Sequence, residues 1–108
     1  MNDAVIGGVA LSPSVVETIA GIAIHDLKEV YCVGSSEFSL FKSSAPIYAS
    51  SDDNKTLNVV VHVTLMNNVC VEEVAKKIRT VVASSIYVQT GIEVKNVDVY
   101  VDGVEYAS

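Results

Sequence analysis

The sequence is short of the residues that mark secreted, redox-active and membrane-spanning proteins. Its 108 residues include no tryptophan, and its two cysteines, Cys32 and Cys70, are too far apart for a CxxC motif. No basic segment precedes an apolar one at the N-terminus, as in a secretory signal. No apolar run approaches the about 20 residues of a membrane-spanning helix. These absences predict a cytoplasmic protein with reduced, buried thiols.

Basic residues are also scarce. Seven lysines and arginines stand against 13 acidic residues, which gives a formal net charge of −6. Nucleic-acid binding draws much of its affinity from basic side chains that neutralise phosphates, so we expect no nucleic-acid partner. The same deficit argues against direct adhesion to an anionic membrane surface, and we expect no membrane insertion.

Apolar residues, in contrast, are plentiful, since half of the chain is hydrophobic and valine is the most frequent residue. β-Branched residues suit strands, and a chain of this length can bury one core. We therefore expect a single domain over residues 1–108, with a valine-rich sheet.

Two stretches have the spacing and the end signals of amphipathic helices. Ser12 before Pro13 provides a cap and a first-turn proline, and apolar residues then recur at helical spacing, which predicts a helix over residues 13–31. A second apolar stripe predicts a helix over residues 70–90, with Gly91 as its C-terminal stop.

Three segments alternate apolar and polar residues as strands do, because successive side chains of a strand point to opposite faces. These segments are residues 46–50, 56–66 and 94–106. In the last of them, Val97, Val99 and Val101 share one face. The order is α-β-β-α-β, so we expect an α+β fold in which both helices pack on one face of a three-stranded mixed sheet.

The ionisable residues form no recognisable catalytic or metal-binding pattern. Asp98 and Asp102 share a strand face, but four residues of extended chain separate them by about 13 Å, wider than the roughly 5 to 9.5 Å of hydrolytic carboxylate pairs. No nucleophile motif surrounds a serine or cysteine, although such a group could still meet a histidine in space. The residues that could offer zinc ligands are His25, Cys32, His62 and Cys70, none at ligand spacing. We expect no catalytic residue, cofactor or metal.

Two regions are candidates for contact with another protein. The first is the sheet face turned away from the helices, where Val60, Met66 and Tyr100 would form an apolar patch of the kind that marks interaction sites. Its predicted members are Asn58, Val60, His62, Thr64, Met66, Asp98 and Tyr100. The alternative is an ordinary solvated face with scattered apolar residues.

The second region is the serine-rich segment of residues 34–44, which holds Phe38 and Phe41. These two side chains either pack under the helices or stay partly exposed as a recognition patch. We expect partial exposure.

Most of the chain, from Gly8 to Tyr106, consists of three stretches: "GGVALSPSVVETIAGIAIHDLKEV", "LNVVVHVTL" and "VCVEEVAKKIRTVVASSIYVQTGIEVKNVDVYVDGVEY". They include Gly8 and Val9 before the first helix, an "EVA" from Glu73, and a "TG" at Thr90 followed by alternating valines. In this order and spacing the chain resembles the alkaline shock protein family, small cytoplasmic proteins linked to envelope stress in Gram-positive bacteria. It departs from the family pattern where Cys32 and the "MNN" before the second helix replace glycines.

The resemblance implies a single alkaline-shock-protein-like domain that associates with itself and is held near the membrane by a transmembrane anchor protein. We therefore expect a non-catalytic, self-assembling cytoplasmic protein of envelope stress response or homeostasis. The alternative is a small cytoplasmic regulator that binds one soluble enzyme or small ligand.

Overall fold

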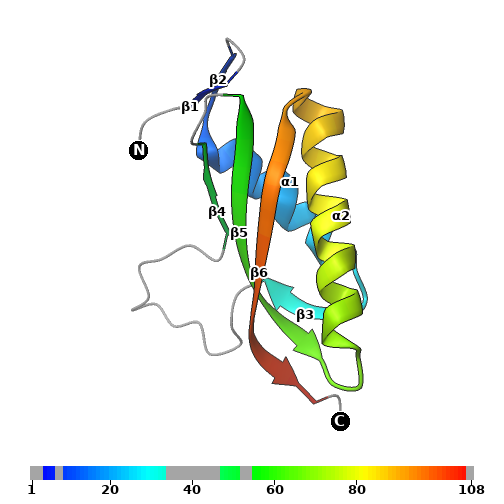
Figure 1. Ribbon diagram of the computed structural model, residues 1–108. Helices are drawn as coiled ribbons and strands as arrows, with labels where there is room; N and C mark the ends of the chain where they lie inside the picture. Colours follow the sequence, from blue (N-terminus) through cyan, green and yellow to red (C-terminus); the bar gives the residue numbers. More distant parts are fainter. Residues whose placement is uncertain (1–3, 7–8, 34–46, 52–54, 107–108) are drawn as a thin grey trace, which may run out of the picture.

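The computed structural model describes residues 4–6, 9–33, 47–51 and 55–106. Over these residues the chain forms an α+β fold of two helices and a sheet, preceded by two short antiparallel strands (Figure 1). The elements are β1 (Ala4–Ile6), β2 (Val9–Leu11), α1 (Pro13–His25), β3 (Val30–Val33), β4 (Ile47–Ser50), β5 (Thr56–Met66), α2 (Val71–Thr90) and β6 (Glu93–Glu105). The predicted α+β class and second helix are confirmed, and the three predicted strands correspond to β4, β5 and β6. The predicted order α-β-β-α-β is incomplete, because it lacks β1, β2 and β3.

The sheet has four strands, so the three-stranded prediction is wrong in this respect. β5 lies at its centre and pairs in parallel with β6 along its whole length, from Thr56 opposite Glu93 to Met66 opposite Glu105. The other edge of β5 is shared end to end by two short antiparallel strands. β4 pairs with residues 58–61 and β3 with residues 63–65. The sheet is therefore mixed, as predicted.

The first helix ends at His25, six residues earlier than predicted. Asp26 caps it, and the chain turns through two backbone hydrogen bonds, from Leu27 N to Ile24 O (3.0 Å) and from Val30 N to Leu27 O (3.1 Å). Residues 30–33 then form β3 beside β5. Leu27 and Val30 do pack against the core, but from a turn and a strand rather than from a helix. Their spacing fits both structures, and pairing with β5 decides between them.

Residues in the left-handed region lie at both ends of α2. Gly91 has φ of 75° and donates its N–H to the Tyr87 carbonyl (2.8 Å), as expected of a C-terminal stop. Asn68, with φ of 63°, turns the chain out of β5. Asparagine tolerates this conformation better than most residues. Asn68 can therefore replace the glycine that the resemblance led us to expect before this helix.

Both helices cover one face of the sheet and bury a common core (Figure 1). The β5 residues in this core are at most 2% exposed. They alternate along the strand as Leu57, Val59, Val61, Val63 and Leu65.

Among the described helices, none is long and apolar enough to cross a membrane.

β6 keeps its valines in phase with β5 by two local irregularities. Relative to β5, its register skips one residue at Lys95 and another at Asp102. As a result Val94 pairs with Leu57 and Val104 pairs with Leu65, which a strict two-residue alternation would not allow. The predicted inward face of Val97, Val99 and Val101 is confirmed, because all three pack against the core.

Candidate functional site on the open face of the sheet

The face of the sheet away from the helices carries two exposed tyrosines. β4 brings Tyr48 beside Val60 of β5, and Val60 lies beside Asp98 of β6. In the next row, His62 pairs with Tyr100. Tyr48 and Tyr100 are 57% and 52% exposed. We call Tyr48, Val60, His62 and Tyr100 the open-face patch.

His62 is fixed at one end of this patch by two neighbours from β6. Its ring stacks on that of Tyr100, with the centroids 4.9 Å apart and the planes 14° from parallel. Its Nδ1 lies 3.0 Å from one carboxylate oxygen of Asp102 and 3.2 Å from the other. Asp102 is one of the two residues that the β6 register skips, and its carboxylate lies beside the imidazole.

An Asp–His pair could orient a general base, but catalysis also needs a reacting group and a site that encloses it. The His62 and Asp102 side chains are 38% and 34% exposed on a sheet surface. Neither residue lines the two hollows described below. The described residues also contain no group of three His, Cys, Asp or Glu side chains that could hold a metal ion. The geometry suits contact with a protein better than capture of a small molecule.

A polar row borders the open-face patch on the side of residue 58. The Asn96 side-chain amide donates a hydrogen bond to the Asn58 side-chain oxygen (3.1 Å). This row joins β5 to β6 at their ends nearer β4. The patch is therefore mixed, with apolar and aromatic side chains between the Asn58–Asn96 pair and the His62–Asp102 contact.

The structure brings together five of the predicted surface residues, namely Asn58, Val60, His62, Asp98 and Tyr100. Met66 does not join them, because six residues of strand separate it from Val60 by about 20 Å. Thr64 is fully buried, so its predicted exposure is wrong. It lies in a row between Cys32 of β3 and Gly103 of β6. Phe38 and Phe41 lie outside the described residues.

Two residues of this surface were missed by the sequence prediction. Tyr48 becomes part of the patch only through the register of β4 on β5. Asp102 lies two residues beyond Tyr100, the β6 partner of His62, and its carboxylate contacts the His62 ring. Alternation was the signal available for both residues, since it places Tyr48 and Asp102 on the outward faces of their strands. Nothing in the sequence indicated the register of either strand on β5.

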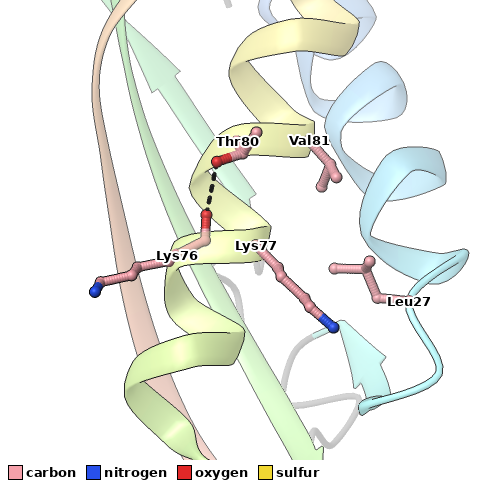
Figure 2. Close-up of a pocket in the computed structure, with 5 residues that line it drawn as sticks. All are labelled: Leu27, Lys76, Lys77, Thr80 and Val81. Carbon is pink, nitrogen blue, oxygen red and sulfur yellow. Dashed lines mark hydrogen bonds between the residues drawn. The ribbon is translucent and has the colours of Figure 1, made fainter.

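Away from the sheet, a hollow of about 370 Å³ lies between α2 and the chain that follows α1 (Figure 2). It is lined by Leu27, Lys76, Lys77, Thr80 and Val81. The Lys77 ammonium donates a hydrogen bond to the Glu29 carboxylate. This bond lowers the pKa of Glu29 and raises the pKa of Lys77. Because Glu29 offsets the Lys77 charge, the hollow is a poor site for an anion.

A second hollow, of about 400 Å³, lies between α1 and β3. It brings His25 and Cys32 to one place, two of the residues considered as zinc ligands, with Asp26 and Tyr31 nearby. Cys70 is exposed, so the prediction that both thiols are buried is wrong.

The chain is similar to known proteins in sequence and in fold. The uncharacterized protein Spy1535 of Streptococcus pyogenes serotype M6 is 24% identical over 108 residues, covering 96% of this chain and 84% of the streptococcal protein. A solved structure titled MamM CTD H264E shares the fold with a TM-score of 0.51 at 13% identity, over 88% of this chain and 95% of that one. The model of the alkaline shock protein family, described as having a cell envelope-related function, matches residues 1–106. The chain therefore belongs to the alkaline shock protein family.

Proposed function

We propose that the protein is a non-catalytic, self-assembling component of cell-envelope homeostasis that works in the cytoplasm near the membrane. Family membership supports the link to the envelope. The observation that carries the proposed mode of action is the open-face patch, which no helix of the described residues covers. Its partners are proposed to be other copies of the chain and a transmembrane anchor protein.

The composition of the patch supports protein contact. Tyrosine offers a large, amphipathic contact area with few rotatable bonds, and it is enriched at protein interfaces. Exposed tyrosines come from both neighbouring strands: Tyr48 lies directly beside Val60, and Tyr100 lies one row away, beside His62. His62 is held in one orientation by Tyr100 and Asp102, so less conformational freedom would be lost on binding.

The test is the double variant Tyr48→Glu with Val60→Lys, which places one charge of each sign in the patch and leaves the net charge unchanged. Neither side chain belongs to the core cluster, so the fold should survive. We expect the mass of the assembled protein, measured by light scattering, to fall because the contact would have to remove two charged groups from water.

Tyr87→Glu with Val88→Lys is a matched control. These α2 residues are 59% and 78% exposed, and the chemical change is the same. The proposal fails if the wild type is monomeric at every concentration tested, or if the control lowers the mass as much as the patch variant does. Retention of one soluble enzyme by both variants, without self-association, would favour the regulator instead.

A further inference from the structure

β6 is a long strand with one unpaired edge in the described part of the chain. It runs for 13 residues and pairs with β5 on one side. Its other edge therefore presents a row of backbone N–H and C=O groups that another strand could pair with. In Figure 1 it is the outermost strand of its side of the sheet.

The centre of this edge, residues 96–101, has few of the features that usually prevent strand addition, since Asp98 is its one charged residue. Proteins commonly block such edges with proline, with charged side chains, lysine above all, or with irregular backbone. β6 contains no proline and a single lysine, Lys95. Its irregular positions are at Lys95 and Asp102, so the segment of residues 96–101 between them is regular. The centre of the strand is thus available for pairing.

The β6 sequence is also nearly symmetric about Val99. Read as EVKNVDVYVDGVE, it has a valine at the same distance on either side of the centre: Val97 matches Val101, and Val94 matches Val104. In an antiparallel pair, residues directly opposite each other lie on the same face. Two copies of β6 paired about Val99 would therefore place each β6 valine of one copy opposite a valine of the other.

From this symmetry we propose that a second copy of the chain pairs with β6 in antiparallel orientation, across a twofold axis at Val99. The proposal names the partner and the surface for part of the self-association proposed above, and it rests on that function. The two sheets would become one continuous sheet. Pairing of identical edges is self-complementary, as a twofold interface requires.

The charges of β6 favour this register over the registers centred one residue to either side. Like charges directly opposite each other destabilise a strand pair. With Val99 at the centre, Asp98 faces Tyr100 of the other copy, and Asn96 faces Asp102. A centre at Asp98 would put the two Asp98 carboxylates together, and a centre at Tyr100 would put Asp98 opposite Asp102. Glu93 and Glu105 would face each other only beyond the regular segment.

The partial burial of the β6 valines also favours this edge as the interface. Val97, Val99 and Val101 pack on the core but remain partly exposed, whereas their β5 partners Val59, Val61 and Val63 are fully buried. A strand added beside β6 would cover apolar surface that α2 leaves exposed. Removing such surface from water is favourable, so the added strand would contribute more than backbone hydrogen bonds.

Disulfide mapping tests the register directly. In a Cys32→Ala, Cys70→Ser background, Val99→Cys should form a disulfide-linked dimer under mild oxidation. Residues opposite each other have Cα atoms about 4.5 to 5.5 Å apart, within the roughly 4.4 to 6.8 Å that a disulfide spans. Thr80→Cys, exposed on α2, measures the rate of random collision.

A second pair of variants keeps the test valid if Val99→Cys misfolds. Asp98→Cys and Tyr100→Cys change exposed side chains on the other face of the strand. Mixed together they should cross-link at least several times faster than either one alone, because each faces the other and not itself. Faster cross-linking of Asp98→Cys or Tyr100→Cys alone would indicate a different register and would overturn the proposal.

Two outcomes separate this proposal from the function on which it rests. If the wild type assembles but Val99→Cys and the mixed pair cross-link no faster than Thr80→Cys, the β6 edge is not the interface and self-association stands. If the wild type is monomeric at every concentration and none of the variants cross-links above the control, both proposals are wrong.

Discussion

β5 and β6 run in parallel beside each other, with valine at alternate positions of both, yet they differ in burial. The inward residues of β5 are at most 2% exposed, whereas those of β6 are only partly buried. Residue type does not explain the difference, since Val61 of β5 pairs with Val99 of β6. Position in the sheet does, because β5 has neighbours on both edges and β6 on one. Alternation in the sequence indicates which face is inward, but topology determines how completely that face is buried.

The largest predicted effect is on stability, and it differs between the two members of this valine pair. Val61→Ala should lower the free energy of unfolding by about 2 to 3 kcal/mol, because the site is fully enclosed and leaves a cavity. Val99→Ala should cost roughly 1 kcal/mol, because part of its surface already meets water. Urea unfolding at low protein concentration measures both values, and equal costs would contradict the contrast between centre and edge.

The second prediction concerns the two turns that connect these strands to α2. Gly91→Ala should cost about 1 to 2 kcal/mol, because alanine is unfavourable at φ of 75°. No atom lies within 4 Å of the added Cβ, so the cost is in the backbone alone. Asn68→Gly, at the turn out of β5, should be neutral or slightly stabilising. Thermal unfolding of the two variants tests this, and destabilisation by Asn68→Gly would show that its side chain matters more than its backbone.

The smallest predicted effect is a pH dependence of stability that arises at Glu29, beside the end of β5. The Glu29 backbone accepts a hydrogen bond from Met66 N at the end of β5 (2.9 Å), and its side chain binds Lys77 of α2. Lys77→Gln removes the second contact. Since the pKa of Glu29 is lowered from its ordinary value of 4.5, its contribution to stability is present above that pH and is lost as the pH falls through the lowered pKa.

The pKa of Lys77 shifts in the opposite sense. It is raised from 10.5, so the contribution of this group is present below that pH and is lost as the pH rises through the raised pKa. The stability difference between wild type and Lys77→Gln should therefore be greatest between about pH 5 and 10, and smaller on both sides. Lys76→Gln, in the same hollow, is the control. A difference that is constant with pH would exclude the ion pair as its cause.

Local signals in the sequence predicted the elements whose patterns are long. Pro13 and Gly91 mark the start of α1 and the end of α2 as expected, and the alternation of β5 gave its bounds, Thr56–Met66. The four-residue β3 was missed because Leu27 and Val30 fit a helical stripe equally well. The decisive interaction is its pairing with the C-terminal part of β5, a contact between distant parts of the chain that local patterns do not encode.

The sequence predicted which face of the sheet carries the candidate site, but not which residues lie next to each other on that face. Val60, His62 and Tyr100 lie on the open face as expected, since alternation alone sets the face of a strand. The proximity of Tyr48 to Val60 and of Asp102 to His62 depends on the registers of β4 and β6 on β5, and the β6 register contains two skipped residues. Burial of Thr64 likewise depends on the arrival of β3 beside it.

The end-to-end arrangement of β3 and β4 limits the valency of any assembly built from this sheet. Each of these strands has four residues, so the edge opposite β6 is broken into two short pieces. Short edge strands are poor templates for strand addition. Pairing through β6 would use the one long edge of the described sheet and would end growth in that direction at two copies. A larger assembly that used the open-face patch would join such dimers in the direction perpendicular to the sheet, two chains at a time.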